Sequence, residues 1–305
     1  MRRALRTVAI VAAVSVAASA AGVAFAAGVA VAWLRRPGPA TVEIHAMDDA
    51  RFRWQPDEPL FVLALGSDER AGLDGARADA IHLIGINPGS GQATILNIPR
   101  DTYVEIPGVG RMRINEAYNH GGPVLQAETV ARFTGARPAF VLVTTFPGLQ
   151  SMVDDMGGVI VDVAETHRDT FSGAFFDPGP NYMDGTQALA YARNRHLTGG
   201  DHTRTANQAN LIIAALRKLR IDGTSPENVV RYLTVLLRHT KTAGVSATDL
   251  FRLGRVALDI DPAAVRNVTM PGRSTFVGRA SVVVPVEPAA ALFADFADDA
   301  VLQSH

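Results

Sequence analysis

The sequence contains no cysteine, which excludes disulfide bonds, thiolate catalysis and cysteine-ligated zinc sites. Lysine is nearly absent too, since Lys218 and Lys241 are the only lysines among 29 basic residues. No H-E-x-x-H spacing or other close histidine pair suited to zinc occurs. Both glycine-rich phosphate motifs, G-x-x-x-x-G-K-S/T and G-x-G-x-x-G, are missing as well. Any phosphate site must therefore be built from side chains, and the abundant cationic side chain is arginine.

The net charge is also small, at −1 for 305 residues. Such a chain has no overall field that attracts nucleic acid or an acidic membrane. It shows no helix-turn-helix pattern and no basic reading helix either, so nucleic acid is not an expected partner. The hydrophobic share of 48% is ordinary for a globular protein, and the length allows one sizeable core or two small ones.

Charge is absent from residues 7 to 34, where the run Val8–Trp33 consists mostly of alanine and valine. As a helix this run would be ~39 Å long, enough to cross a ~30 Å hydrocarbon core with tilt. Three arginines precede it and two follow, so the positive-inside bias is slight. A cleaved signal peptide is the alternative, but its apolar region usually spans only ~7–15 residues. We expect residues 1–36 to be a cytoplasmic tip and single-pass transmembrane anchor in the cell membrane, with the C-terminal domain extracellular.

Residues 37–58 are proline-rich and are interpreted as an extracellular stalk, followed by one folded domain over 59–300. Strands are expected at Leu60–Leu65, Ile81–Ile86, Ala93–Ile98, Phe140–Val143, Val159–Val163, Asn267–Met270 and Ala280–Val286. Helices are expected at Glu116–Phe133, Phe146–Met156, Gly185–Asn194, Arg204–Leu219, Pro226–Arg238, Ala247–Leu258 and Pro288–Phe296. This alternation predicts an α/β layered domain, with a central mixed sheet flanked by helices on both faces.

Two aspartates stand at the edges of neighbouring predicted strands. Asp68 follows Leu60–Leu65, and Asp79 precedes Ile81–Ile86. If these strands pair in antiparallel fashion, both carboxylates converge at one end of the sheet, where they repel each other unless a cation lies between them. Mg²⁺ commonly takes one or two carboxylates and completes its shell with water and phosphate oxygens. The alternative, equally weighted, is that Asp68 caps a turn and Asp79 pairs with Arg77.

Arg100 and Asp101 follow Pro99 directly after the strand Ala93–Ile98. Proline fixes its own φ and biases Ile98 toward an extended conformation, so Arg100 leaves the strand end in a restrained direction. Asp101 could orient Arg100 or take a proton as a general base. A surface ion pair at a strand end is the alternative, and the motif alone does not decide between them.

A third block surrounds the start of the helix Arg204–Leu219. Arg204 and Gln208 are four residues apart and share a helix face. Arg193 and Arg195 lie at the end of the preceding helix, and Asp201 lies in the loop between. Guanidinium forks bind phosphate oxygens bidentately, so these side chains could hold a diphosphate. Spacing alone slightly favours a solvated, arginine-rich surface.

Taken together, the blocks resemble the LytR-CpsA-Psr family of cell-wall ligases in order and context. The matching stretches are Leu65-Gly66-Ser67-Asp68-Glu69-Arg70, Ile98-Pro99-Arg100-Asp101-Thr102-Tyr103-Val104, Arg113-Ile114-Asn115-Glu116-Ala117-Tyr118, Gly157-Gly158-Val159 and Leu189-Ala190-Tyr191-Ala192-Arg193-Asn194-Arg195-His196. Asp201, Arg204 and Gln208 follow the last of them. The similarity covers about residues 60–219, and nothing beyond about residue 220 matches a motif.

The resemblance implies an anchored α/β enzyme that binds a polyprenyl-diphosphate-linked glycopolymer at the membrane. It would move the polymer, with one phosphate, onto a peptidoglycan hydroxyl. By the same resemblance, Asp68 and Asp79 would hold Mg²⁺, with Mn²⁺ as the alternative ion. The diphosphate would be bound by Arg100, Arg193, Arg195, Arg204 and Gln208. Arg100 and Asp101 would be catalytic, with Asp101 as the candidate base.

The chain departs from the family pattern beside two of these positions. Ala78 and Ala80 flank Asp79 where hydroxyl residues are usual, which implies weaker support for a metal. Asn207 precedes Gln208 where arginine is common, which implies one phosphate contact fewer. Two other functions therefore stay open: hydrolysis of the polyprenyl diphosphate, and a non-catalytic lipid-phosphate binding module.

Overall fold

The computed structural model describes residues 42–47, 58–67, 77–222 and 240–303, with the single positions 225, 228, 232 and 235. The expected anchor, Asp68 and most of the expected helix Pro226–Arg238 lie outside these residues. Within the described part, no helix is both long enough and apolar enough to cross a bilayer.

A seven-stranded mixed sheet forms the centre of the fold, in the order β12-β1-β7-β2-β3-β4-β13. Its strands are β1 (Val42–Ala46), β2 (Leu60–Ser67), β3 (Ala78–Asn87), β4 (Gln92–Asn97), β7 (Phe140–Thr145), β12 (Thr240–Ala243) and β13 (Val265–Thr269). The pairs β2–β3, β3–β4 and β1–β7 are antiparallel, whereas β2–β7, β1–β12 and β4–β13 are parallel. The predicted α/β class and mixed sheet are confirmed.

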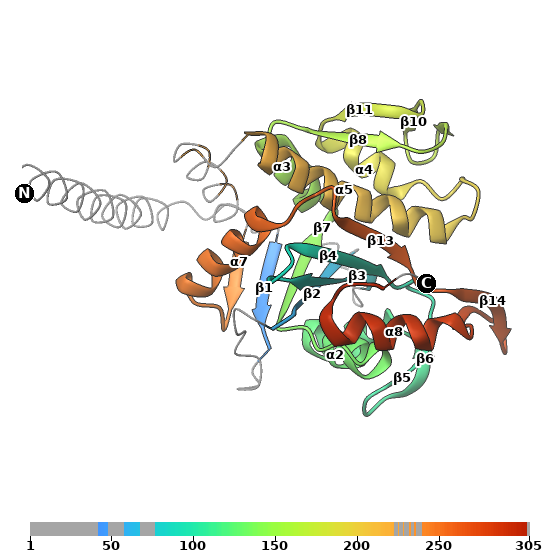
Figure 1. The fold of residues 1–305 in the computed structure, drawn as a ribbon. Coiled ribbons are helices and arrows are strands. Elements are labelled where there is room, and N and C mark those ends of the chain that lie inside the picture. The colour runs from blue at the N-terminus through green and yellow to red at the C-terminus, as the bar shows by residue number, and fades with distance from the viewer. Residues whose placement is uncertain are drawn as a thin grey trace, which may run out of the picture. The chain divides into compact units, whose positions relative to one another are not determined.

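Helices cover both faces of this sheet (Figure 1). They are α2 (Glu116–Thr134), α3 (Phe146–Asp155), α4 (Gly185–Arg193), α5 (Asp201–Asp222), α7 (Ala247–Asp259) and α8 (Pro288–Asp299). Alternation along β2 separates the faces: Leu63 packs with α2 and α8, whereas Val62 packs with α3, α5 and α7. Burial of apolar side chains on both faces is the main force that holds the layers together.

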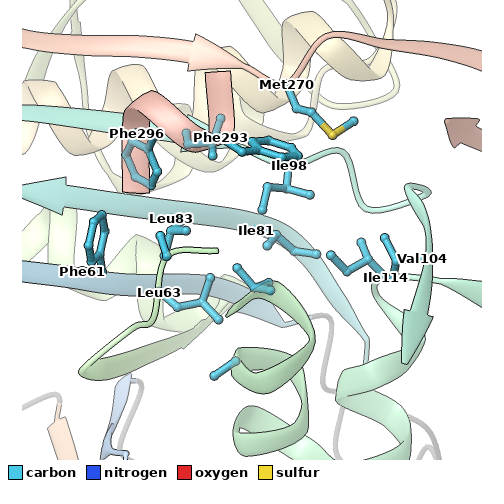
Figure 2. Close-up of a cluster of buried hydrophobic side chains, with 14 of the residues drawn as sticks. Phe61, Leu63, Ile81, Leu83, Ile98, Val104, Ile114, Met270, Phe293 and Phe296 are labelled. Atoms are coloured by element: carbon cyan, nitrogen blue, oxygen red, sulfur yellow. The ribbon is translucent and has the colours of Figure 1, made fainter. Parts of the chain in front are cut away.

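The face under α8 holds the larger cluster of buried side chains, which Figure 2 shows. Phe61 of β2 meets Phe296 of α8 edge-to-face, with ring centroids 5.3 Å apart. Gly85 of β3 makes this contact possible, because a Cβ there would lie 2.8 Å from the Phe296 ring. The helix therefore approaches the strand backbone directly.

Within the described residues, four two-stranded sheets lie outside the central sheet, and the sequence predicted only two of their strands, Val159–Val163 and Ala280–Val286. These sheets are built from β5 (Tyr103–Ile106) with β6 (Gly110–Arg113), β8 (Val159–Val163) with β11 (Gly179–Met183), β9 (His167–Asp169) with β10 (Ala174–Phe176), and β14 (Gly272–Val277) with β15 (Ala280–Pro285). The first and last are linked where Val283 of β15 donates its N–H to the Asp101 carbonyl at 2.9 Å. This bond attaches the C-terminal hairpin to the loop that carries Arg100 and Asp101.

One domain boundary needs correction. The predicted stalk, residues 37–58, contains β1, which pairs with both β7 and β12. Val42 and Ile44 alternate with polar residues and are buried in the sheet, a period of two that the flanking prolines obscured. The folded domain therefore begins before residue 59.

Candidate active site

Asp79 lies at an irregularity of the β2–β3 ladder, near the start of β3. Along the β2–β3 ladder, Gly66 pairs with Ala80 and Ser67 pairs with Ala78, so Asp79 is the additional residue of a bulge. A bulge changes the direction of a side chain and often lies beside a functional site. The antiparallel pairing also confirms that the end of β2, where Asp68 follows, meets the start of β3.

Arg100 is the side-chain partner of Asp79. Its Nη1 donates to Asp79 Oδ1 at 2.5 Å, and both side chains are largely buried. Arg100 Nε also lies 3.9 Å from Asp101 Oδ2. Arg77, the alternative partner suggested by the sequence, pairs instead with Glu116, at 3.3 Å. The loop after β4 thus brings its arginine to the start of β3.

The α4–α5 segment brings the remaining arginines to the same place. Asp184 caps α4 through a capping box with Gln187, as predicted. The chain leaves the helix in an extended conformation at Asn194, which is buried and bonded to His167. It re-enters a helix at Asp201, three residues earlier than expected. The buried bond between Asn194 and His167 therefore fixes the start of the short loop that carries Arg195.

Arg204 lies almost fully buried in the first turn of α5. Its Nη2 pairs with Asp201 Oδ1 at 2.7 Å and donates to the Asp79 carbonyl at 3.2 Å. Arg195 Nε is 3.7 Å from the same Asp201 oxygen. A continuous series of contacts therefore joins Arg100, Arg195 and Arg204, which we call the arginine cluster. The convergence predicted from the sequence is confirmed for these three arginines and Asp79.

The pKa values of two arginines reflect this crowding. Burial alone would lower the pKa of Arg100, but the charges of Asp79, Asp101 and Asp201 outweigh it and raise the value. Burial lowers the pKa of Arg204, and the charges of Arg195 and Arg100 add to the effect against the attraction of Asp201. The arginines therefore sense one another electrostatically, and an anion bound between them would relieve the repulsion.

Unused hydrogen-bond donors point the same way. Arg100 Nε and Arg204 Nε are buried and have no hydrogen-bond acceptor among the residues that the structure describes. Buried N–H groups are rarely left unpaired in proteins. Phosphate oxygens are strong acceptors for guanidinium donors. The donors of the arginine cluster are therefore of the type that suits an anion such as phosphate.

Gln208 and a buried histidine, His82, lie close to Arg204. Gln208 Nε2 donates to the Ala192 carbonyl at 3.0 Å, which ties α5 to α4. His82 of β3 is 4% exposed and bonds to Asn97 through Nδ1 at 2.7 Å. Burial lowers the pKa of His82 to about 4, aided by the charge of Arg204 and opposed by its bonds to Asn97 and Gln208. His82 is therefore neutral at neutral pH.

Stability should depend on pH through His82. Its pKa is about 4 in the folded protein and about 6.5 when unfolded, so between these values the unfolded chain binds a proton that the folded one does not. The free energy of unfolding should fall by about 3 kcal/mol from this residue as the pH falls through that window. Denaturant titrations at several pH values should show a shallower acid decline for His82→Asn than for the unmodified chain. His202→Asn, at a partly exposed position on α5, serves as the control, and parallel curves for His82→Asn would contradict the assignment.

Not every predicted residue joins the cluster in the described contacts. The Arg193 guanidinium lies over the Phe146 ring, 5.5 Å from its centroid, at the start of α3. Its role in diphosphate binding stays a prediction. Asp68 lies outside the described residues, so its role also stays a prediction. Asn207 is buried and accepts a hydrogen bond from the Tyr191 hydroxyl at 3.0 Å, so this departure from the family pattern serves the packing of α4 on α5.

Arg113 is a site residue that the sequence reasoning missed. Its Nη1 lies 3.5 Å from Asp101 Oδ1, and its Nη2 donates to Glu116 at 3.2 Å. The stretch Arg113-Ile114-Asn115-Glu116, which matches the family pattern, was the available signal. Asp101 thus lies between Arg100 and Arg113.

The donor set suits a metal that needs few protein ligands. In the described ranges, no group of three acidic or histidine side chains could hold an ion. Asp79 is a largely buried carboxylate next to the arginine cluster. Mg²⁺ takes one or two carboxylates and fills its shell with water and phosphate oxygens, so Asp79 can serve as a ligand, and the magnesium site with Asp68 stays a prediction.

Comparison with known proteins places this geometry in context. The model of the LytR_cpsA_psr family matches residues 38–294. A polyisoprenyl-teichoic acid–peptidoglycan teichoic acid transferase, TagU of Bacillus mycoides, is 35% identical over 190 residues. That match covers 61% of this chain and 60% of the relative, so the chain spans about three fifths of the length of the curated relative.

Solved structures share the fold. The crystal structure of B. subtilis TagV has a TM-score of 0.66 at 22% identity, with 78% of this chain and 94% of that chain covered. The LytR-Csp2A-Psr enzyme from Actinomyces oris has a TM-score of 0.66 at 24% identity, with 86% and 97% covered. With the family model matching most of its length, the chain belongs to the LytR_cpsA_psr family.

Proposed function

We propose that this protein transfers a glycopolymer, with one phosphate, from a polyprenyl-diphosphate carrier onto a hydroxyl of peptidoglycan. The observation that carries the proposal is the arginine cluster, in which two buried guanidinium groups beside Asp79 have an Nε–H without an acceptor among the described residues. Membership of the family and the similarity to a relative named as a peptidoglycan teichoic acid transferase support the same class of reaction. A site with these cations suits a diphosphate.

The arginines would act on the charge that develops during transfer. The acceptor oxygen forms a bond to the glycan-side phosphorus, and the bond from that phosphorus to the bridging oxygen breaks. Polyprenyl monophosphate leaves with the electron pair. Guanidinium groups fixed in a largely buried site stabilise negative charge on the bridging and equatorial oxygens at little reorganisation cost. Arg100 and Arg204 are held by Asp79 and Asp201 in that position.

Asp101 would accept the proton of the acceptor hydroxyl. Its side chain is 29% exposed, so a substrate can reach it, and contacts to Arg100 and Arg113 fix its direction. A general base must lie within hydrogen-bond reach of the proton that it removes.

Mg²⁺, with Mn²⁺ as its alternative, is part of the proposal. Asp79 and Asp68 would hold the ion, which would neutralise charge on the diphosphate when bound. Removal of divalent cations with a chelator should lower transfer by about 100-fold or more, and added Mg²⁺ should restore it. Asp79→Asn should raise the Mg²⁺ concentration that gives half-maximal transfer, whereas Asp177→Asn, at an exposed aspartate, should not. Full activity after removal of divalent cations would show that transfer does not need a metal ion.

Location and partners follow from the same proposal. The uncharged run Val8–Trp33 supports an anchor in the cell membrane, with residues beyond it on the extracellular side. There the lipid carrier and the peptidoglycan are both within reach of one domain. Nucleic acid is not a proposed partner.

Incubation of the full chain with a lipid-linked glycopolymer, with and without peptidoglycan, tests the function. We expect polyprenyl monophosphate to be released and the polymer to become attached to peptidoglycan through one phosphate. Release at the same rate without peptidoglycan, with free polymer as the product, would show a hydrolase instead. Binding of the lipid without turnover in the presence of Mg²⁺ would show a binding module.

A further inference from the structure

A groove lies beside the arginine cluster, between the β5–β6 hairpin, the start of α2 and the β14–β15 hairpin. These elements gather at one end of the molecule (Figure 1). The groove encloses about 380 Å³. Its lining includes Tyr103, Arg111, Arg113, Glu116, His120 and Val282. A concave site with a few convergent polar groups on a partly apolar wall is typical of a ligand pocket.

The groove begins where the candidate active site ends. Arg113 lines the groove and lies 3.5 Å from Asp101, which in turn lies 3.9 Å from Arg100. A backbone hydrogen bond also connects the groove with Asp101. Val283, which follows the groove residue Val282, donates its N–H to the Asp101 carbonyl. A molecule in the groove would therefore reach the candidate base past Arg113.

The lining chemistry suits a sugar ring. The Arg111 guanidinium lies over one face of the Tyr103 ring, 5.4 Å from its centroid, so the planar cation stacked on the ring forms a platform whose outer face is flat and delocalised. A pyranose has one C–H face that can lie on such a platform and hydroxyl groups around its rim. Glu116 can accept hydrogen bonds from those hydroxyls, while Arg113 and His120 can donate to them.

The charges of the groove argue against a second phosphate. Arg113 already contacts two carboxylates, Asp101 at 3.5 Å and Glu116 at 3.2 Å. Glu116 also contacts Arg77. These pairs neutralise Arg113 and leave Arg111 as the main charge of the groove, whereas the arginine cluster has buried donors without an acceptor among the described residues. An anionic diphosphate is thus better accommodated at the cluster, and a polar, weakly charged glycan is better accommodated in the groove.

We propose that this groove binds the acceptor glycan of peptidoglycan, with one sugar ring on the Tyr103–Arg111 platform and its reactive hydroxyl directed at Asp101. This inference rests on the proposed function and gives the acceptor a place in it. The acceptor hydroxyl would then lie between Asp101 and the glycan-side phosphorus, with the bridging oxygen on the far side of that phosphorus, the arrangement that an in-line displacement requires.

Binding of a peptide-free tetrasaccharide of alternating N-acetylglucosamine and N-acetylmuramic acid tests the groove without any transfer step. With the full chain in detergent micelles, Tyr103→Ala and Arg111→Ala should each weaken binding about tenfold by calorimetry. Two controls are matched by residue type: Tyr182→Ala, at an exposed tyrosine on β11, and Arg137→Ala, at an exposed arginine between α2 and β7. In the transfer assay, the same two groove variants should raise the KM for peptidoglycan, while a short-chain polyprenyl diphosphate still binds.

The outcomes separate the two proposals. Weakened tetrasaccharide binding in a chain that transfers nothing would keep the groove and reject the proposed function. Unchanged tetrasaccharide affinity in both groove variants would reject the groove and leave the proposed function standing. Loss of affinity for the polyprenyl diphosphate instead of the tetrasaccharide would assign the groove to the donor and overturn the inference.

Discussion

Arg100→Ala is expected to lower transfer by about 10³-fold or more, the range found when an arginine that stabilises phosphoryl-transfer charge is removed. Two effects combine in this variant. The diphosphate loses a guanidinium with a buried, unpaired Nε–H, and Asp79 loses the partner that lies 2.5 Å away. An isolated carboxylate would then remain where the substrate brings further negative charge. Release of polyprenyl monophosphate under saturating peptidoglycan measures the effect.

Arg195→Ala provides an independent check of the same cluster. Arg195 is more exposed than Arg100 and makes a single, longer contact to Asp201, at 3.7 Å, so its loss should leave the fold intact. We expect transfer to fall strongly, with an unchanged unfolding midpoint. Arg100→Lys should recover part of the activity, because it keeps the charge and loses the planar fork. Near-normal transfer by Arg100→Ala or Arg195→Ala, with Arg137→Ala as the exposed-arginine control, would refute the diphosphate assignment.

Asp101→Asn is expected to have the second large effect, a loss of about 10²–10⁴-fold in the rate of transfer, the usual contribution of a general base. The amide keeps the shape of the side chain but has one acceptor oxygen, so it can keep its contact to only one of Arg100 and Arg113, and it cannot take up a proton. The acid limb of the pH–rate profile should therefore disappear together with the rate. Binding of the polyprenyl diphosphate should change little.

The pH profile distinguishes a base from a residue that only positions Arg100. If Asp101 acts by positioning alone, Asp101→Asn would lower the rate and keep the acid limb. Asp101→Glu, which restores the carboxylate one methylene further out, should recover part of the rate and the limb as well. Asp177→Asn, on the exposed β10–β11 connection, serves as the control for loss of an aspartate.

The sequence supported the fold class because the strands of the central sheet, except β1 and β12, and the helices that cover it carry local signals. The turn Asn87-Pro88-Gly89-Ser90-Gly91 separates β3 from β4, and the capping box of Asp184 and Gln187 begins α4. It failed for β1, whose period-two pattern is only five residues long and follows a proline-rich stretch. It also failed for the short hairpins. Their pairing depends on tertiary packing, such as the bond from Val283 to Asp101.

Candidate site residues could be chosen from residue type, but their geometry could not. The antiparallel pairing of β2 and β3 was a stated condition, and the bulge that redirects Asp79 leaves no mark in the sequence. Arg193 and Arg195 are two residues apart, yet one lies over Phe146 and the other reaches Asp201. Nothing in the sequence singled out His82, because a single histidine within an apolar strand is usually a structural residue. Only its position beneath Arg204 and Gln208 gives it a role.

A structure of the full chain with a short-chain polyprenyl diphosphate and Mg²⁺ would test the central claim most directly. We expect both phosphates to lie among Arg100, Arg195 and Arg204, with the ion between Asp79 and a phosphate oxygen. Phosphates bound on another face, with these guanidinium groups still paired only to aspartates, would contradict the account.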